Sequence, residues 1–443
     1  MEQKGKMGLI GAISTLVGTM VGSAIFVLLG PLIEKTGGSL FIAFFIGAIP
    51  AFLGSVYYIQ LGALFPRTGG SYFYASRLLN PAAGILNGMF LIFAVIGAIG
   101  MLGLGFSEYL TYYFNEVPII PSAILIILLF YVINLFGIKT ANIIQIGMVV
   151  WMLLALLIFI IPGLQYEPTI KLSNGPLLSN GVSGLLFASV LSFYSYAGYG
   201  IITEIGGEIK NPQKNTPRAI IISLLLVMII YMGVSYVATS VTSIESLISS
   251  KASIPMAAEL FLPSWLVTFI GVGGLFAIAT TLNAILLVGP QELRVMAKDN
   301  LVSERFMKLH SKSQIPYIAL SVLVFIPILL ILAGVSGTIF ATMTVVGLLL
   351  SGVITGFAAL KIHKRFPQEV KKASIKIPKS ILLFCCWAGI ITSFLFTILA
   401  MLDAPIVGIS LVIIIPLTLI YYHFRKKVIH RISFDLFDET KTL

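Results

Sequence analysis

Long apolar segments follow one another along almost the whole chain of 443 residues, and short polar connections separate them. Hydrophobic residues make up 58% of the chain and charged residues only 10%, whereas about 25% of the residues of a soluble domain are charged. A helix of about 20 apolar residues crosses the hydrocarbon core of a bilayer with its backbone groups paired internally. The sequence therefore predicts an all-α, multi-pass protein of the cell membrane, surrounded by the lipid bilayer.

The apolar runs predict twelve transmembrane helices. Their expected positions are 8–34, 39–65, 81–114, 119–137, 141–163, 183–206, 218–241, 264–296, 316–333, 337–360, 380–402 and 405–424. The connections are too short to hold a separate soluble domain. In the connection over 242–263, both a short surface helix that covers the outer face and an ordinary loop are compatible with the sequence.

Basic residues are distributed unevenly between the connections. If the N-terminus is cytoplasmic, all of the 28 lysine and arginine residues except Lys35, Lys171 and Lys251 face the cytoplasm. Short cytoplasmic connections of membrane proteins carry an excess of these residues. We therefore expect both termini in the cytoplasm. The same placement accounts for the net charge of +11, so this charge does not indicate a nucleic-acid partner.

Two of the predicted helices contain small residues at mid-membrane depth. The first has Gly18, Gly22 and Ser23, and the sixth has two glycines and a serine in the tyrosine-rich stretch 193–200. Small residues allow close helix packing, but they also mark interrupted helices, which are tolerated at this depth only where they line a cavity enclosed by protein. Because the two stretches stand five helices apart, we favour the interruption, which is typical of transporters with inverted repeats.

This interpretation divides the chain into two inverted repeats. Helices 1–5 lie over 1–163 and helices 6–10 over 183–360, followed by helices 11 and 12 over 380–424 and a cytoplasmic tail over 425–443. Helices 1 and 6 are expected to be unwound in mid-membrane. The N-terminal ends of half-helices present amides that suit a carboxylate, and unwound carbonyls suit an ammonium group. Together they predict a site for a zwitterionic α-amino acid.

The inventory of reactive residues argues against other classes of membrane protein. Cys385 and Cys386 are adjacent in an apolar run, and all four histidines lie in connecting or terminal segments or, for His423, at the very end of the last predicted helix, so no metal site or histidine relay is expected. An enzyme would need a catalytic pair within the bundle, and a channel would need a filter motif or a charged ring. The sequence indicates neither, and we expect no cofactor apart from a coupling ion.

Four stretches carry a family resemblance, in the same order as in the family. Residues 207–219 resemble the E-x-K-N-P-x-x-x-x-P-R-A loop of amino acid–polyamine–organocation (APC) transporters, and residues 66–74 resemble their P-x-x-G-G-x-Y-x-Y loop. Residues 22–26 are similar to the family's G-S-G-I-F signature, and residues 294–299 are similar to its R-x-x-x-A-x-D motif with one residue fewer between the arginine and the alanine. The resemblance spans about residues 8–360. It implies the leucine-transporter-like fold and a secondary active transporter of amino acids, a symporter or an exchanger, that works by alternating access.

The resemblance also implies positions for the substrate. The carboxylate would meet the Ser23 hydroxyl and the Ala24 amide, the amine would meet backbone carbonyls, and Tyr194 would close over the substrate as a gate. The substrate-binding set implied in this way consists of Met20, Gly22, Ser23, Ala24, Ile25, Gly97, Met101, Tyr194, Ser195, Tyr196, Ala197, Gly198 and Ile285. Ala24 stands where the family usually has glycine, which implies a more constrained loop or a narrower pocket.

The expected pocket walls bear on selectivity. They are Gly97, Ala98, Met101, Ile285 and Thr342, and none of these residues is charged. Such walls favour neutral, small to medium apolar amino acids. A carrier of amines or polyamines is the alternative within transport, but it would need an acid in the pocket, and the sequence indicates none.

The ion that drives transport stays open at this level. Met152 aligns with the position where several sodium-independent relatives carry a lysine on helix 5. The hydroxyls of Thr280 and Thr281 on helix 8 are of the kind that a sodium ion binds, and Glu108 and Glu204 are carboxylates that could carry a proton. Sodium coupling, proton coupling and transport without an ion at this site are all compatible with these residues.

Overall fold

The computed structural model describes residues 7–429 apart from 23, 28, 66–68, 115, 168–177, 179, 205–208, 251, 311–312 and 374. Within helices, the description of residues 24, 27, 138–142, 194, 197, 201, 204, 372 and 426–429 covers the backbone alone. The described part is built of helices, and its one β-bridge joins Met7 to Ile209 beside the start of the first helix. The expected all-α fold class is therefore confirmed.

Helices stand at all the places where the apolar runs predict them. The first half contains α1 (Leu9–Val21), α2 (Ala24–Val27), α3 (Leu29–Thr36), η1 (Gly37–Ser39), α4 (Leu40–Leu64), α5 (Gly70–Leu78), α6 (Pro81–Leu110), α7 (Ile119–Leu135) and α8 (Ile138–Gln165). The second half contains α9 (Gly181–Tyr194), η2 (Ala197–Gly200), α10 (Ile201–Glu204), α11 (Pro212–Val241), α12 (Ile244–Ser249), α13 (Ser253–Ala258), α14 (Ser264–Lys298), η4 (Glu304–Met307), α15 (Tyr317–Leu332) and α16 (Gly337–Leu360). The chain continues through α17 (Ile362–Arg365), α18 (Pro367–Lys372), α19 (Lys379–Asp403) and α20 (Pro405–Ile429).

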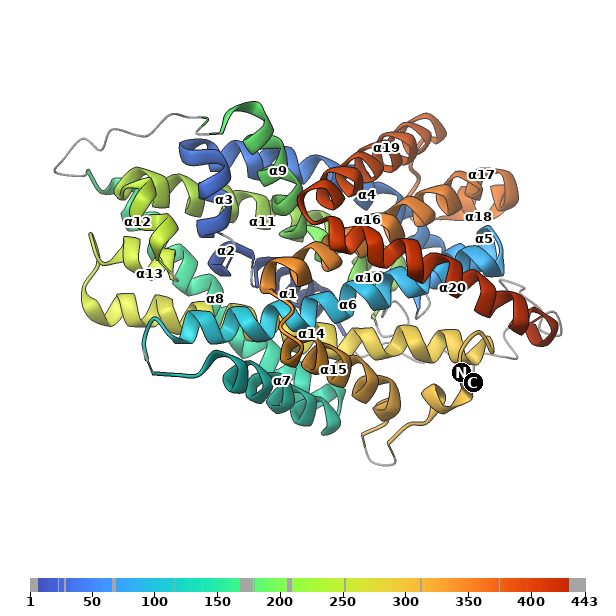
Figure 1. The fold of residues 1–443 in the computed structure, drawn as a ribbon. Coiled ribbons are helices and arrows are strands. Elements are labelled where there is room, and N and C mark those ends of the chain that lie inside the picture. Colours follow the sequence, from blue (N-terminus) through green and yellow to red (C-terminus); the bar gives the residue numbers. More distant parts are fainter. Residues whose placement is uncertain are drawn as a thin grey trace.

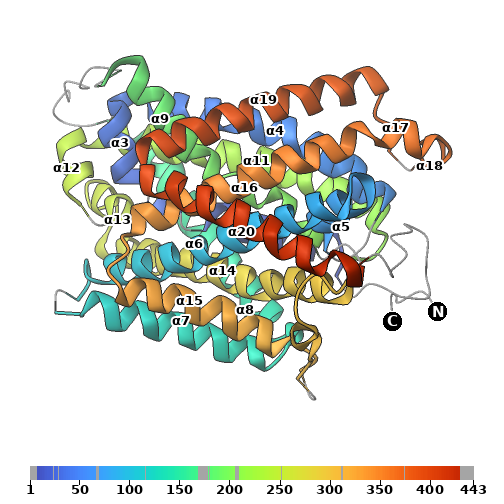
Figure 2. The same ribbon diagram turned by 45° about the vertical axis from the view of Figure 1, so that its right-hand side comes forward.

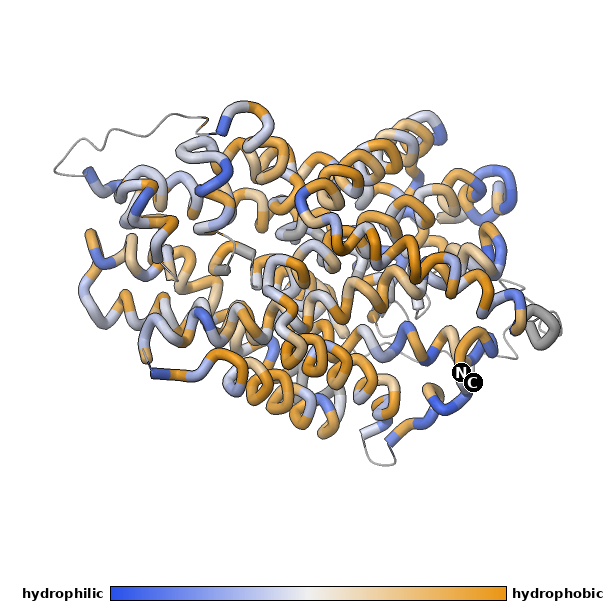
Figure 3. Tube along the Cα trace, in the orientation of Figure 1, coloured by the Kyte–Doolittle hydropathy of each residue, from blue (hydrophilic) through white to orange (hydrophobic). Residues whose placement is uncertain are grey.

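The lengths of these helices suit a membrane. Within the described ranges, 9 helical segments are long and apolar enough to cross a bilayer, and three shorter apolar helices, α1, α7 and α15, accompany them. The helices lie side by side along one common direction (Figures 1 and 2). Hydrophobic residues occupy the length of the helices, and hydrophilic residues gather mainly at the two ends of the bundle (Figure 3). This arrangement is that of a multi-pass membrane protein.

The centre and the rim of the bundle differ in what they bury. α14 is buried along most of its length and packs against α1, α6, α8 and α15. On α7, α19 and α20, by contrast, Leu125, Phe384 and Val412 are exposed apolar side chains. Exposed apolar residues on the outer helices face lipid in a bilayer, so their exposure carries no hydrophobic penalty there.

The two ends of the bundle carry different short helices. α12 and α13 lie at one end, and α5, α17 and α18 lie at the other (Figures 1 and 2). The sequence was compatible with either a short surface helix or a loop in the connection 242–263. The structure has two short helices there, α12 and α13. The apolar runs do not predict α5. It begins directly after Gly69, whose φ of +85° is a conformation that glycine adopts without strain.

A buried ion pair holds α5 to the end of α14. Nη2 of Arg77 lies 2.8 Å from Oδ1 of Asp299, and the hydroxyl of Tyr72 also donates to Asp299. Burial lowers the pKa of the Arg77 guanidinium, but the hydrogen bonds and the negative charge of Asp299 outweigh it, so this pKa lies above its ordinary value. Asp299 is the last residue of the stretch 294–299, which resembles an APC motif. Its carboxylate therefore serves as the anchor between two segments that the sequence places far apart.

Removing one partner of this pair is expected to destabilise the fold strongly. The side chains of Arg77 and Asp299 are only 10% and 9% exposed, and an uncompensated buried charge costs about 3–5 kcal/mol. Arg77→Ala should therefore lower the thermal unfolding midpoint of the purified protein clearly. The matched control is Lys35→Ala, since the Lys35–Asp403 pair is 30% and 36% exposed and exposed pairs contribute about 0–1 kcal/mol. Equal shifts for the two variants would contradict this assignment.

Candidate functional site

Both glycine-containing stretches coincide with helix ends. α1 ends at Val21, Gly22 has φ −44° and ψ −96°, and α2 begins at Ala24. In the second stretch α9 ends at Tyr194, and the 3-10 helix η2 begins at Ala197. Ser23 lies outside the described residues, and Ala24, Tyr194, Ala197 and Glu204 are described by their backbone alone.

The glycines of α1 lie where other helices approach most closely. A Cβ atom on Gly22 would come 1.3 Å from Oγ1 of Thr281 and 2.6 Å from the carbonyl oxygen of Ala277, both on α14. A Cβ atom on Gly18 would come 2.5 Å from Nε2 of Gln145 on α8. Close packing, which the sequence left open as an alternative to interruption, therefore applies to these glycines.

The second stretch rests directly on the first. A Cβ atom on Gly198 would come 2.7 Å from Oγ1 of Thr19 and 3.1 Å from Cγ of Met20. The absence of a side chain at Gly198 thus allows η2 to touch the last turn of α1. The two stretches, which are far apart in the sequence, meet at one place in the bundle.

The last carbonyls of α1 receive hydrogen bonds from other helices. A helix that ends at Val21 leaves its final four carbonyls without partners inside the helix. The hydroxyls of Thr280 and Thr281 lie 3.3 Å and 3.1 Å from the carbonyl oxygen of Gly18. Both hydroxyls also contact the carbonyl of Ala277 on their own helix, at 2.8 Å and 3.3 Å. These two residues, which the sequence offered as possible sodium ligands, act here as donors that hold α14 to α1.

Tyr231 on α11 contacts both stretches. Its hydroxyl donates to the carbonyl of Met20 and lies 3.4 Å from the carbonyl of Ser195. Its ring stacks on Phe44 with centroids 5.0 Å apart and meets the ring of Tyr196 edge-on at 5.7 Å. The sequence analysis missed Tyr231. Its position inside an apolar helix could have indicated such a role, because a buried tyrosine hydroxyl usually has a hydrogen-bond partner.

A row of hydrogen-bonded amide side chains connects α7, α14 and α8. The side-chain amide of Asn134 on α7 donates to Asn283 at 2.9 Å, and the amide of Asn283 donates to Gln145 at 3.0 Å. Gln145 in turn lies against Gly18. Met152 aligns with the position where several relatives carry a lysine. It is fully buried and lies about two helical turns beyond Gln145 on α8. The polar group of α8 that reaches α1 is therefore Gln145, seven positions before Met152.

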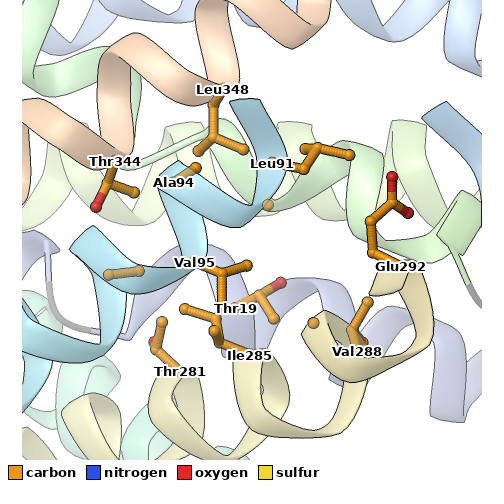
Figure 4. A pocket seen from close by; sticks show the side chains of 13 residues that line it. Thr19, Leu91, Ala94, Val95, Thr281, Ile285, Val288, Glu292, Thr344 and Leu348 are labelled. Carbon is orange, nitrogen blue, oxygen red and sulfur yellow. The ribbon is translucent and has the colours of Figure 1, made fainter. Parts of the chain in front are cut away.

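A cavity of about 80 Å³ opens beside the place where the two stretches meet (Figure 4). One water molecule needs roughly 10–15 Å³ on the same scale, so the cavity has room for a small molecule. Its walls come from α1, η2, α6, α14 and α16, and the lining residues are Thr19, Leu91, Ala94, Val95, Ala98, Gly198, Thr281, Ile285, Val288, Gly289, Glu292, Thr344 and Leu348. The two stretches thus contribute Thr19 and Gly198 to one shared, mostly aliphatic space.

The expected pocket residues fall into two groups. Ala98 and Ile285 line the cavity. Gly97 instead faces α16, where a Cβ atom would come 2.7 Å from the carbonyl of Phe340, and Thr342 lines a second, smaller cavity. Ile25, Met101, Ser195 and Tyr196 are buried, and they are not among the residues that line the cavity beside Thr19 and Gly198.

One charged residue lines the cavity that is not among the expected pocket residues. Glu292 lines the cavity and is only 5% exposed. It follows Thr281, Ile285 and Val288 on one face of α14 (Figure 4). The spacing of these residues, four, three and four positions, is that of a single helix face. Counting along this face from Thr281 was the signal that would have revealed Glu292.

The close approach at Gly22 predicts a large effect of a single methyl group. Gly22→Ala would drive Cβ into Thr281 and Ala277, and overpacking of this kind costs about 1–3 kcal/mol or more. We expect a lower thermal unfolding midpoint for this variant. The control is Gly147→Ala on α8, where a Cβ atom meets nothing within 4 Å and alanine is favoured over glycine in a helix by up to about 1 kcal/mol. A Gly22→Ala variant as stable as Gly147→Ala would contradict the observed contact.

Several known proteins are similar to the chain in sequence. An uncharacterized protein of Methanocaldococcus jannaschii is 32% identical over 69% of this chain and 72% of its own length. The branched-chain amino acid permease BcaP of Bacillus subtilis is 24% identical over 68% of this chain and 69% of its own length. The methylthioribose transporter of Bacillus subtilis is 24% identical over 93% of this chain and 91% of its own length.

A family model also matches almost the entire chain. The model described as amino acid permease covers residues 7–421. This range includes all four motifs that resemble APC transporters, both glycine-containing stretches and the cavity between them. The chain therefore belongs to the amino acid permease family of the APC superfamily, whose members are membrane transporters and not enzymes.

Proposed function

We propose that the chain is a secondary active transporter of neutral, apolar amino acids, either a symporter or an exchanger, that works by alternating access. The substrate is held where α1 gives way to α2 and α9 gives way to η2. Membership of the amino acid permease family supports transport of amino-acid-like substrates. The location of the binding site and the substrate class are our inference.

One observation carries this proposal: the two stretches meet at a single cavity. Thr19 from the last turn of α1 and Gly198 from η2 both line it, and Gly198 lies directly against Thr19. A helix end at membrane depth is tolerated where it faces an enclosed space. Two such ends on one space form the kind of site that transporters with inverted repeats use.

The chemistry of helix ends suits a zwitterion. The start of α2 offers backbone amides and a positive dipole end to a carboxylate, and in our proposal Ser23 and the Ala24 amide supply these contacts. Carbonyls at the ends of α1 and α9 would accept from the ammonium group. Tyr194 would act as the gate. No charged side chain is needed for the parts common to all amino acids.

The cavity walls support an apolar substrate. Leu91, Val95, Ile285, Val288 and Leu348 are aliphatic and line most of the space. Apolar surface removed from water contributes about 25 cal/mol per Å², so an aliphatic side chain gains more from these walls than a polar one. The name of the similar permease of Bacillus subtilis, which specifies branched-chain amino acids, points in the same direction.

The proposal includes a division into repeats and an orientation. Residues 1–163 and 183–360 would form the two inverted repeats, with helices 11 and 12 over 380–424 and a tail over 425–443. Both termini would be cytoplasmic. This orientation is supported by the short helices at the two ends of the bundle (Figure 1): α17 and α18 belong to the lysine-rich connection, and α12 and α13 to the opposite one.

A second candidate substrate class follows from Glu292. The sequence argued against a carrier of amines or cationic amino acids because it indicated no acid in the pocket. Glu292 lines the cavity and could pair with a cationic group. Neutral and cationic substrates therefore need to be distinguished by direct competition.

Uptake by the purified protein in liposomes tests the proposal. A labelled neutral amino acid such as leucine would be exchanged against a panel of unlabelled competitors on the other side of the membrane. We expect aliphatic amino acids to support this counterflow and arginine, lysine and diamines to support little. Counterflow of cationic substrates alone would favour the second candidate, and counterflow of no amino acid or amine would overturn the proposed function.

Tyr231 provides a single-atom test of the proposed site. Tyr231→Phe removes the hydroxyl that donates to the carbonyl of Met20, and a lost buried hydrogen bond costs about 1–3 kcal/mol. We expect uptake to fall by roughly tenfold, which corresponds to about 1.4 kcal/mol. Tyr236→Phe is the control, because Tyr236 lies on the same helix and is exposed. Equal uptake by the two variants would show that the hydroxyl of Tyr231 is dispensable for transport.

A further inference from the structure

A crevice of about 660 Å³ lies at the end of the bundle that carries α5, α17 and α18 (Figures 1 and 2). Its walls come from the start of α6, the end of α16, and from α17 and α19. The described residues that line it are all half-buried or exposed, so it opens to the surroundings of the bundle. It shares no lining residue with the cavity beside Thr19 and Gly198. The crevice is therefore a separate feature, with a volume typical of a ligand site, roughly 300–1,000 Å³.

The walls of the crevice are apolar on the side toward the middle of the bundle. Ile354 on α16 stands seven residues before Lys361, which corresponds to about 10 Å along the helix axis, and both residues line the crevice. Between them, the ring of Phe357 meets the ring of Trp387 on α19 edge-on, with centroids 6.1 Å apart. These two rings are 39% and 51% exposed. Because exposed apolar side chains on the outer helices face lipid, these walls suit a hydrocarbon chain.

The mouth of the crevice is positively charged. Lys361 follows the last residue of α16, and Lys364 lies three positions further on α17, so the two lysines are neighbours on one helix face. Both are exposed, and the described residues that line the crevice include no aspartate or glutamate. Neither lysine belongs to an ion pair within the part of the chain that the structure describes. Their charges are therefore available to an anion from outside the protein.

The start of α6 contributes to the same mouth. The side-chain oxygen of Asn80 caps this helix by accepting from the amide of Ala83 at 2.8 Å, and both residues line the crevice. A helix start carries the positive end of the helix dipole, and phosphate groups bind at such ends. The 30-residue helix α6 therefore adds a positive partial charge to those of the two lysines.

The turn that carries the lysines is held in place by packing. Ile362, between them in the sequence, is fully buried. Nη1 of Arg365 donates to the backbone carbonyl of Arg77 on α5 at 3.2 Å. The ring of Phe366 meets the ring of Phe65, which follows α4, edge-on with centroids 5.3 Å apart. Lys361 and Lys364 thus project from a fixed turn beside the start of α6, and the crevice has one charged end and one apolar end.

We propose that this crevice binds an anionic phospholipid. An acyl chain lies on the apolar walls, and the phosphate lies near Lys361, Lys364 and the start of α6. A zwitterionic headgroup would also bring a cation, for which the lining provides no acid. In the orientation proposed above, this end of the bundle faces the cytoplasmic leaflet, and basic pockets between transmembrane helices on that side bind anionic headgroups. The inference goes beyond the proposed function, because lipid binding here requires no transport.

Trp387 provides a probe inside the crevice, because bromine atoms on an acyl chain quench the fluorescence of a tryptophan that they contact. The full-length protein would be reconstituted in vesicles that mix phosphatidylcholine and phosphatidylglycerol in varied proportions. In one series the phosphatidylglycerol would carry brominated chains, and in the other the phosphatidylcholine. The signal of Trp387 is the difference between the wild type and Trp387→Phe, which keeps an aromatic ring beside Phe357.

The two lysines set the expected size of the effect. One lysine near a membrane surface strengthens the attraction to anionic lipid by about fivefold, and two lysines by about 30-fold. We expect quenching of Trp387 to show a preference of this order for phosphatidylglycerol over phosphatidylcholine. The double variant Lys361→Gln with Lys364→Gln should lose most of this preference.

A second double variant controls for the general loss of positive charge. Arg305→Gln with Lys308→Gln also removes two exposed charges. Both residues lie on or directly after η4, which packs against α14 and α15 and contributes no residue to the crevice. We expect this variant to keep the preference of the wild type for phosphatidylglycerol.

Three outcomes would overturn the inference. Equal quenching of wild-type Trp387 by the two lipids would mean that the crevice has no preference for an anionic headgroup. Quenching by neither lipid would mean that protein fills the crevice. An equal loss of preference in the two double variants would assign the effect to surface charge in general. All three outcomes leave the proposed amino acid transport untouched, since no transport is measured.

A second measurement uses the wild type alone and covers the case in which the lysine variant does not fold. Glycerol phosphate in solution offers the same phosphate without acyl chains. We expect a large excess of it to leave the quenching of Trp387 by brominated phosphatidylglycerol unchanged, because the apolar walls hold the lipid. Relief of the quenching by glycerol phosphate would assign the mouth of the crevice to a soluble phosphate compound and contradict the lipid site.

Discussion

A backbone carbonyl at membrane depth needs a hydrogen-bond donor from the protein, because lipid provides none. The end of α1 at Val21 creates this need for the carbonyls of the last turn. Thr280 and Thr281 on α14 donate to Gly18, and Tyr231 on α11 donates to Met20. These three side chains make a helix end possible inside the bundle. The cavity, and with it the proposed site, depends on them.

The glycines and the donors act together. Gly22 allows α14 to approach until the hydroxyl of Thr281 occupies the place where a side chain of α1 would otherwise lie. Gly198 allows η2 to rest on Thr19 in the same way. The buried pair of Arg77 and Asp299 then fixes the far end of α14 to α5. The helix that carries Thr281, Ile285 and Glu292 is thus held at both the site and its end.

Much of this arrangement can be predicted from the sequence, because hydrophobic length alone determines where membrane helices lie. The helix ends at the two glycine-containing stretches fall where the small residues indicate them. The partners of those ends could not be predicted in the same way. Tyr231 and Gln145 reach α1 from helices whose rotation is set by packing and not by composition. Glu292, by contrast, follows Ile285 by seven positions on one helix face, so its place in the cavity wall could have been predicted from this spacing.

Several of the expected site residues make contacts with neighbouring helices and not with the cavity. Gly97 contacts α16 and does not face the cavity because Phe340 and Thr344 fill the space beside it. Thr280 and Thr281 contact a carbonyl of α1 directly, so in this structure the joint between α1 and α14 is made by the protein itself. Met152 lies apart from this joint, and Gln145 contributes the polar group of α8. These contacts are set by side-chain packing, which the family resemblance does not give.

The central claim is that an amino acid binds where the two helix ends meet. Hydrogen–deuterium exchange of the purified protein, with and without a saturating neutral amino acid, tests it most directly, since amides at helix ends lack partners within their helix. The account predicts slower exchange in peptides over 18–26 and 193–200 together, and unchanged exchange over α12 and α20. Binding of the amino acid with protection confined to other segments would contradict it.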